Sequence, residues 1–336
     1  MPNLDLAAST RAGELDPPWR SALRSVAFEA FVAGAMPDQT EEIWRYVDLD
    51  FDLNDFTAAT SVIPELGEDP LLEYLTNPIA VRVAGDGYVG TDHVDERFTV
   101  MSLRRAAVEH PDAVREVIER AGVTADDGLF AAAAGAFGSD GVFVSVAPST
   151  VAPSVVAIDL QAGPDGSVTF PTVAVSAGEH ADVSVVVHLR SQDGAGAIVV
   201  PQFSTVVGAG ARVSLSLVQN LGYSARSLGY LRTEVGRDAR FQFGEIGLGG
   251  SLARLHLDVG LEGRGSSANV VGAYFGEQHQ VLDYRYFMRH VGTNTRSDMF
   301  LKGAVEDQAR SVFTGMIRIE ESGQKTEAFQ TNRNLI

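Results

Sequence analysis

Residues 211–257 read ARVSLSLVQNLGYSARSLGYLRTEVGRDARFQFGEIGLGGSLARLHL, and within this stretch one short phrase returns four times. The phrase starts with alanine and arginine and continues as Val213-Ser214-Leu215, Ser227-Leu228, Phe241-Gln242-Phe243 and Leu255-His256-Leu257. Apolar and polar residues that alternate with a period of two are typical of a strand with one buried face. The stretch therefore predicts a series of equivalent β-strands.

The repeat extends to both sides of this stretch. Its seven alanines are separated by 16, 14, 14, 14, 14 and 15 residues, and we assign them one common register: Ala181, Ala197, Ala211, Ala225, Ala239, Ala253 and Ala268. Turn residues lie between the units, at Gly208, Gly210, Gly222, Gly236, Gly250 and Gly265. One strand and one corner repeated at a nearly fixed step predict a β-solenoid, in which each coil covers the next.

The length of the step predicts how the solenoid is wound. A unit of 14 or 15 residues is short for a complete coil, so we expect two units in each turn, or about 28–30 residues. The result is a flattened helix with two facing sheets. An antiparallel sandwich is the alternative, but its strands recur roughly every 8–12 residues and the constant longer step favours the solenoid.

The first third of the chain predicts a mixed region. Helical spacing, capping residues and a glycine-rich turn predict a helix, a short capped helix, a hairpin and a further helix, over Trp19–Met36, Glu41–Tyr46, Ile79–Val89 and Asp112–Ala121. The sequence therefore predicts a small α/β N-terminal region over residues 1–125 and a β-helix core over residues 126–336. The predicted fold class is mainly β.

Composition restricts the partners and the chemistry. The chain has 26 Lys plus Arg against 44 Asp plus Glu, a formal charge of −18, and no cysteine. This acidic balance disfavours nucleic acid and anionic membranes as main partners. Without cysteine the chain has no disulfides, no thiolate metal site and no cysteine nucleophile. No secretory signal and no apolar run of about 20 residues are present, so we expect a soluble, cytoplasmic protein.

Catalytic patterns are weak. His188 and His256 alternate with apolar neighbours, which is typical of packed strand residues, and no compact metal-binding spacing is present. Gly247-Leu248-Gly249-Gly250 precedes a repeat strand and not a helix, which argues against a phosphate-binding loop. Asp182 and Asp258 are too scattered to form the carboxylate cluster of a polysaccharide-acting β-helix enzyme. We therefore predict no catalytic, cofactor-binding or metal-binding residue.

The segment after residue 282 carries the most specific motifs. They are Asp283-Tyr284-Arg285, His290, Thr293-Asn294-Thr295-Arg296-Ser297, Leu301-Lys302-Gly303, Asp307, Ala309-Arg310-Ser311-Val312-Phe313-Thr314-Gly315-Met316-Ile317 and Lys325–Leu335. This pattern resembles the SufB/SufD family of iron–sulfur cluster assembly proteins. Glu42-Ile43-Trp44-Arg45-Tyr46 resembles an element near the start of SufD, and Asp140-Gly141-Val142-Phe143-Val144 resembles the entry into the family's solenoid. The first element and the absence of cysteine make the chain more SufD-like than SufB-like.

The resemblance implies a fold and a role. Family members have an N-terminal helical region, a central right-handed parallel β-helix and a C-terminal helical region that docks the SufC ATPase. The implied role is a non-catalytic scaffold subunit of the SufB–SufC–SufD complex that pairs with SufB. The iron–sulfur cluster then belongs to the complex, and this chain alone binds no cofactor. The sequence ends before the expected SufC-binding region, so SufC docking is expected to be missing here.

Five polar residues are the candidate contacts with SufB, because they lie in or beside the last predicted strands. They are His290, Arg310, Gln330, Asn332 and Asn334. The alternative is that they complete corners and stacked ladders within the last coils. Gly303 and Gly315 are expected at tight corners. The repeat alone also fits a polysaccharide-acting β-helix enzyme or a generic solenoid binding module, and only the motifs after residue 282 separate these alternatives from the scaffold.

Overall fold

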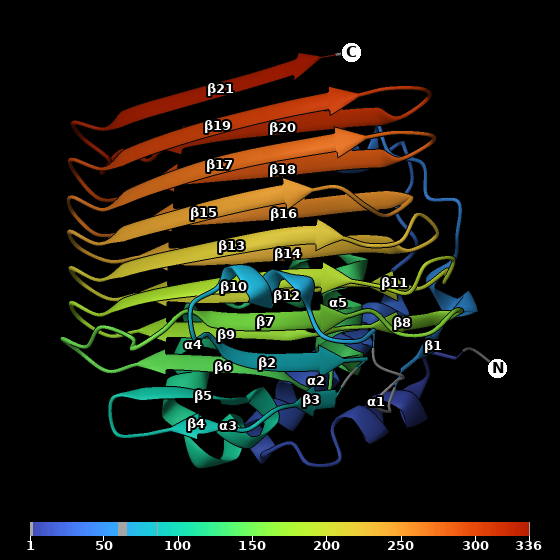
Figure 1. Ribbon diagram of the computed structural model, residues 1–336, viewed down its shortest axis with the longest axis horizontal. Coiled ribbons are helices and arrows are strands. Elements are labelled where there is room, and N and C mark those ends of the chain that lie inside the picture. Colours follow the sequence, from blue (N-terminus) through green and yellow to red (C-terminus); the bar gives the residue numbers. More distant parts are fainter. Residues whose placement is uncertain (1–2, 60–65, 86, 336) are drawn as a thin grey trace.

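The computed structural model describes residues 3–59, 66–85 and 87–335. Figure 1 shows parallel strands stacked as successive coils, with helices gathered around the N-terminal coils. The predicted fold class is confirmed: the protein is a parallel β-helix flattened into two sheets and preceded by a small α/β region.

The strands of the coils are divided between two sheets. Among the described residues, one sheet has twelve strands: β1 (Thr57–Ala58), β4 (His93–Val94), β5 (Phe98–Ser102), β6 (Gly141–Val146), β8 (Ser167–Thr169), β9 (Thr172–Ala177), β11 (Ile198–Val199), β12 (Gln202–Val207), β14 (Arg226–Val235), β16 (Leu252–Leu261), β18 (Val281–His290) and β20 (Arg310–Ile319). The other has nine: β2 (Ile79–Ala84), β3 (Gly87–Val89), β7 (Val156–Gln161), β10 (Asp182–Arg190), β13 (Arg212–Asn220), β15 (Arg240–Gly247), β17 (Ser267–Gly276), β19 (Arg296–Val305) and β21 (Glu327–Leu335). We call them the first sheet and the second sheet.

The helices belong to the N-terminal half. They are α1 (Leu6–Ala12), α2 (Pro18–Ala33), α3 (Leu103–Glu109), α4 (Pro111–Ala121) and α5 (Leu129–Phe137), with the short 3₁₀ helices η1 (Glu42–Trp44), η2 (Leu53–Asp55), η3 (Pro70–Tyr74) and η4 (Ala125–Asp127). The predicted helices over Trp19–Met36 and Asp112–Ala121 are confirmed as α2 and α4, and Gly34 ends α2. The capped helix predicted over Glu41–Tyr46 is shorter, a single turn at η1.

The predicted hairpin is also present. Strands β2 and β3 pair in antiparallel fashion. Asp86 in its turn, and Ile336 at the end of the predicted core, lie outside the described residues. Helix α5 has no counterpart in the sequence predictions, because its alanine-rich stretch has no polar face to reveal a helical period. The division near residue 125 stays a prediction, and strand β2 from before it pairs with strand β7 from after it.

From β13 onward two strands and two corners make one turn, as predicted, whereas in the two preceding turns the first sheet contributes two shorter strands, β8 with β9 and β11 with β12. Consecutive strands such as β13, β14 and β15 alternate between the sheets. Paired residues in neighbouring coils are separated by 26 residues at the least, where Arg226 pairs with Leu252, and by 31 where Arg296 pairs with Glu327. The coil length therefore varies slightly around the predicted value.

The common register assigned to the seven alanines is wrong for the last two. Ala253 pairs with Ser227 and Ala268 pairs with Phe241, so each is displaced by two residues from the column that the earlier alanines form. A displacement of two keeps the same face of the strand towards the core, because side chains alternate with a period of two. All seven alanines are accordingly buried.

A four-residue corner recurs before each long strand of the second sheet. It consists of glycine, any residue, a residue with φ between 54° and 73°, and a small residue. The left-handed position is held by His180, Gly210, Asp238, Gly265, Asn294 and, with φ 59°, Lys325. In the first five corners, the backbone N–H of this residue donates to a carbonyl in the next coil over 2.8–2.9 Å. The corners are thus stacked by backbone hydrogen bonds.

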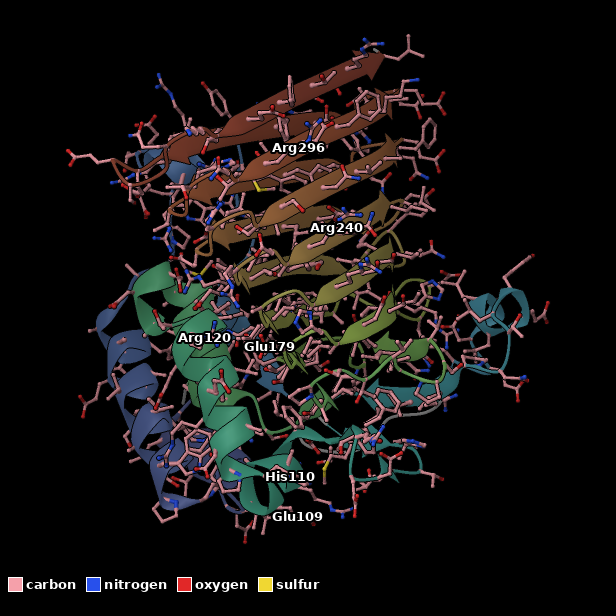
Figure 2. All side chains as sticks on the ribbon, turned by 90° about the vertical axis from the view of Figure 1, so that its left-hand side faces the viewer. Glu109, His110, Arg120, Glu179, Arg240 and Arg296 are labelled. Atoms are coloured by element: carbon pink, nitrogen blue, oxygen red, sulfur yellow. The ribbon has the colours of Figure 1, made fainter. Side chains whose placement is uncertain are left out.

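The helical layer covers the outer face of the first sheet. In Figure 2 the helices lie together against one side of the strands. Arg120 of α4 pairs with Glu234 of β14 at 2.6 Å. Beneath α3 and α4, three apolar residues of the first sheet are buried in a cluster with residues of these helices: Phe143, Ala174 and Val206. The second sheet leaves the arginine of the repeat exposed, as at Arg240.

Gly263→Ala tests the corner. An added Cβ would lie 2.0 Å from the backbone N of Arg237, and backbone cannot move aside as a side chain can. We expect the free energy of unfolding, measured by urea denaturation, to fall by about 2–3 kcal/mol. Gly244→Ala is the matched control, because the nearest atom to its Cβ is Ser216 Oγ at 3.5 Å. Equal stability of the two variants would contradict the corner's role.

Candidate functional site

The last described coil consists of β20 and β21. Among the described residues, β20 pairs only with β18, and β21 pairs only with β19. Four of the five predicted contact residues lie on these two strands and are exposed: Arg310, Gln330, Asn332 and Asn334. The structure therefore brings these four together at the terminal coil.

In the coil before, the positions of Gln330 and Asn332 are held by apolar residues, and that of Asn334 by Gly303. Gln330 pairs with Met299, and the same inward column continues through Val270 and Phe243. Asn332 pairs with Leu301, whose side chain is 1% exposed. The inward face of the second sheet thus changes from apolar residues to a row of amides in β21. An amide in this place demands hydrogen-bonding partners, whereas an apolar residue would not.

The structure corrects the role predicted for two glycines. Gly303 and Gly315 lie within strands β19 and β20, not at corners. A Cβ on Gly303 would lie 2.1 Å from the ring of Tyr274, and a Cβ on Gly315 would lie 2.3 Å from the amide nitrogen of Gln330. The two glycines leave room for larger side chains that cross the interior. Through the first gap, the hydroxyl of Tyr274 donates to Asn334 Oδ1 over 2.7 Å.

The structure places His290 away from the exposed edge. Its ring is fully buried, with Nδ1 2.8 Å from Thr295 Oγ1 and Nε2 2.9 Å from Ser297 Oγ. Burial lowers the pKa of His290 below its usual value. Thr295 Oγ1 lies 2.9 Å from Thr326 Oγ1 in the next corner. His290 therefore supports one corner from inside and does not reach the surface of this chain, while Thr295 links that corner to the next.

A carboxyl group inside the coils was missed by the sequence predictions. Glu245 of β15 is 5% exposed and accepts a hydrogen bond from the hydroxyl of Tyr286. Burial raises its pKa to about 8, against the lowering effect of that hydrogen bond. The two-residue alternation could have revealed this inward carboxyl group, since Phe241 and Phe243 place residue 245 on the inward face.

Two motifs from opposite ends of the chain meet on the outer face of the first sheet. The guanidinium of Arg254 lies 3.8 Å from the ring centre of Trp44 and donates to the carbonyl of Ile43 over 3.0 Å. It also pairs with Asp283, whose side chain is 1% exposed. Burial raises the pKa of Asp283 although Arg254 and Arg285 lower it. The Trp44 and Asp283 motifs thus anchor the N-terminal region on the solenoid.

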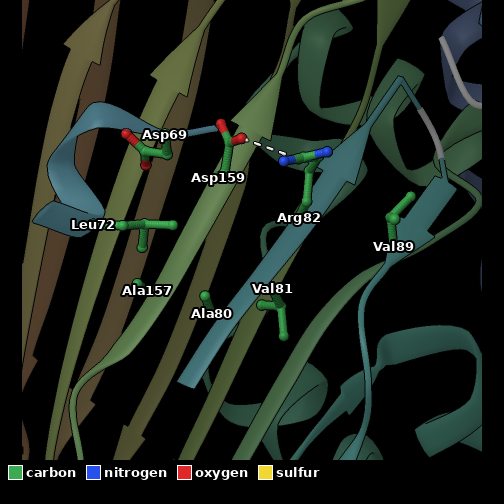
Figure 3. Close-up of a pocket in the computed structure, with 8 residues that line it drawn as sticks. All are labelled: Asp69, Leu72, Ala80, Val81, Arg82, Val89, Ala157 and Asp159. Atoms are coloured by element: carbon green, nitrogen blue, oxygen red, sulfur yellow. Dashed lines mark hydrogen bonds and ion pairs between the residues drawn. The ribbon is translucent and has the colours of Figure 1, made fainter. Parts of the chain in front are cut away.

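A pocket of about 200 Å³ lies on the outer face of the second sheet, between η3 and strands β2 and β7. Figure 3 shows Arg82 of β2 reaching Asp159 on the neighbouring strand β7. Arg82 Nε lies 3.2 Å from Asp159 Oδ2. Arg190 binds the same carboxylate with Nε at 2.9 Å and Nη2 at 2.6 Å. Nearby, Nδ1 of the buried His188 lies 2.7 Å from Asp69. Asp159 is thus held by two arginines.

Metal ligands do not gather within the part of the chain that the structure describes. No group of three or more His, Asp or Glu side chains there is placed to hold a metal ion. His256 packs between the rings of Tyr230 and Phe287, at 6.0 and 5.0 Å, and burial lowers its pKa to about 4.

None of the described helices is both long and apolar enough to span a membrane.

Comparison with known families agrees with the geometry. Residues 160–336, more than half of the chain, match the model of the SUF system FeS cluster assembly, SufBD core domain. The chain belongs to the SufBD family. The matched region begins in β7 and contains the corners, the terminal coil and the Asp283 motif. The matched model describes the core domain of SUF-system FeS cluster assembly proteins.

Individual relatives carry the same family names. An iron–sulfur cluster assembly SufBD family protein of Mycobacterium tuberculosis is 26% identical over 213 residues, which are 61% of this chain and 53% of the relative. A SufBD family protein of Mycobacterium leprae is 27% identical over 39% of this chain and 35% of its own length. The Escherichia coli protein SufD is 29% identical over 26% and 21%. The chain thus spans about half the length of the first of these relatives.

Asp283→Ala tests the anchor between the two motifs. Removing this carboxylate leaves the charge of Arg254 buried and unpaired, so we expect the free energy of unfolding to fall by about 3–5 kcal/mol. Glu327→Ala is the control, because its pair with Arg296 is 61% and 58% exposed on the two side chains. That change is expected to cost less than about 1 kcal/mol. A cost for Asp283→Ala no larger than that of the control would contradict the anchor.

Glu245→Gln tests the buried carboxyl through pH. A folded-state pKa of about 8 lies above the usual value of 4.5, so the folded protein holds a proton that the unfolded chain releases. Burial of Glu245 therefore lowers stability as pH rises from about 5 to 8, by at most about 1.4 kcal/mol per pH unit. Urea denaturation at pH 5, 6.5 and 8 is expected to show the variant gaining on the wild type as pH rises. A constant difference would contradict this pKa.

Proposed function

We propose that this SufBD family chain is a non-catalytic, SufD-like scaffold subunit of the SUF complex that pairs with SufB through its terminal coil. The observation that carries the proposal is the row of amides on the inward face of β21, at Gln330, Asn332 and Asn334. Strands β20 and β21 also present backbone groups to which no strand among the described residues pairs. Such an edge is suited to adding a further strand.

The remaining predicted contacts have different parts in this proposal. Arg310 stands exposed at the first position of β20 and is proposed to contact SufB directly. His290 is buried and contributes by holding one of the last corners in place through Thr295 and Ser297. The proposal therefore places the direct contacts on β20 and β21 and gives His290 an indirect role.

The assembled cluster is the cargo of the complex and not a resident group of this chain. The 336 residues contain no cysteine, so they supply no thiolate ligand for iron. Because the chain spans about half the length of the Mycobacterium tuberculosis relative, docking of the SufC ATPase is proposed only for segments beyond the matched coils. We propose a cytoplasmic location because the proposed complex contains that ATPase.

The enzyme alternative has less support. A polysaccharide-acting β-helix needs free carboxylates gathered on one sheet face, with one ionised and one protonated group. Asp159 is bound by Arg82 and Arg190, and Asp258 lies 3.5 Å from Arg232. A generic binding module does not explain the motifs shared with the family model.

Co-purification with SufB tests the proposal. The variant combines Gln330→Ala, Asn332→Ala and Asn334→Ala in the protein as its gene encodes it, co-expressed with SufB. Each lost interface hydrogen bond is worth about 0.5–1.5 kcal/mol, so the combined change is expected to weaken pairing by about tenfold or more.

The matched control is Gln242→Ala combined with Arg240→Ala, two exposed outward positions on β15 in the middle of the stack. The control is expected to retain SufB at the wild-type level. Equal retention of SufB by the triple variant and the control would show that the amides of β21 do not form the interface.

A further inference from the structure

A second cavity lies at the opposite end of the molecule, beneath the helical layer. It has a volume of about 190 Å³ and lies between helices α2 and α5 and the outer face of strands β9 and β12. Its apolar wall includes Ala27, Ala131 and Ala134, all of them buried. Leu23 and Val26, 49% and 62% exposed, form its rim on α2. Neither the last coil nor the Arg254 anchor takes part in it.

Two hydrogen-bond donors in the cavity lining have no acceptor. Arg20 Nη1 and Gln202 Nε2 are both buried, and neither has a partner among the described residues. Gln202 is 8% exposed, and its strand β12 fixes its direction on the outer face of the first sheet. Buried donors are almost always bonded in folded proteins, so an unused pair in one cavity needs an explanation.

Positive charge exceeds negative charge around these donors. Three arginines, Arg20, Arg24 and Arg104, interact with two carboxylates, Asp16 and Asp140. Asp140 also accepts hydrogen bonds from the hydroxyl of Ser102 and from two backbone N–H groups. Asp16 accepts from Arg24 through Oδ2, whereas its buried Oδ1 has no hydrogen-bond partner among the described residues and lies 3.5 Å from Arg20 Nε.

The neighbouring arginine is fully used. Arg24 binds Asp16 with two nitrogens, at 2.8 and 2.7 Å, and donates to the carbonyls of Ala136 and Gly138 at 2.8 and 2.9 Å. Arg20 reaches Asp16 only through Nε, at 3.5 Å. Burial lowers the pKa of Arg20, but a guanidinium stays protonated in proteins. One buried positive charge is therefore left for an anion to balance.

We propose that this cavity binds a small monocarboxylate with an apolar body. The carboxylate oxygens accept hydrogen bonds from Arg20 and Gln202, and the apolar body lies against Ala27, Ala131 and Ala134. The cavity volume equals that of about six waters at roughly 30 Å³ each, which suits a short aliphatic chain. A single surplus positive charge matches a monoanion, whereas a doubly charged phosphate would leave one negative charge unbalanced.

Isothermal titration calorimetry with sodium hexanoate is the test. Hexanamide is the matched neutral ligand, with the same chain and nearly the same shape, and inorganic phosphate is the anion without an apolar body. Hexanoate is expected to bind saturably with one site, and at least about tenfold more tightly than either hexanamide or phosphate, because it alone offers charge and apolar surface together.

Variants locate the binding. Arg20→Met is expected to weaken hexanoate binding at least about tenfold, and Ala134→Leu, which fills the cavity without changing charge, to abolish it. Arg212→Met is the control, because it removes the same charge from a side chain that is 69% exposed on the second sheet. Thermal unfolding of each variant checks that it is folded.

Three results would overturn the proposal. They are the absence of saturable hexanoate binding to the wild type, hexanamide or phosphate binding as tightly as hexanoate, and unchanged binding in a folded Arg20→Met or Ala134→Leu variant. The comparison of ligands on the wild type holds even if a variant does not fold.

Discussion

The stacked corner before each strand of the second sheet is the constraint on which the rest of the protein depends. A glycine is required at its first position, since the corner of the neighbouring coil passes against it, as Arg237 does at Gly263. A left-handed residue follows, and its N–H reaches the next coil. Because the bond joins equivalent corners, it fixes the register of the coils even where their lengths differ by several residues.

Fixed register turns the sequence into columns, and the columns connect the fold to its surfaces. Inward columns are apolar through most coils and become amides at β21, where pairing with SufB is proposed. Outward positions of the first sheet carry Arg254 and Asp283, which hold the N-terminal region through Trp44. The same sheet carries Gln202, beneath the helical layer. One repeated backbone geometry thus positions the functional side chains at both ends of the solenoid.

Local pattern was sufficient to predict much of this fold. Alternation within the alanine–arginine phrases predicts the strands, and their spacing predicts two strands in each turn. The register of Ala253 and Ala268 was not predictable in that way, because a shift by two residues leaves every side chain on the same face. A better guide was the spacing of the corner glycines, whose positions follow the coils.

The candidate site was predicted only in part. Gln330, Asn332 and Asn334 lie on the terminal strand as expected, but His290 is buried among hydroxyl groups. The roles of Gly303 and Gly315 depend on Tyr274 and Gln330, side chains that reach across coils and are remote in sequence. The contact of Trp44 with Arg254 is likewise a product of tertiary packing, which no local period encodes. Alternation places Glu245 on the inward face but does not reveal its hydrogen bond with Tyr286.

Native-state hydrogen exchange at the corner amides tests the central claim most directly. The backbone N–H groups of His180, Gly210, Asp238, Gly265 and Asn294 each donate to the next coil in this structure. They are expected to exchange as slowly as the amides of the buried strands, although they lie in corners. Exchange at the rate of unprotected loop amides would show that the corners are not stacked in solution, and the register of the coils would then need another cause.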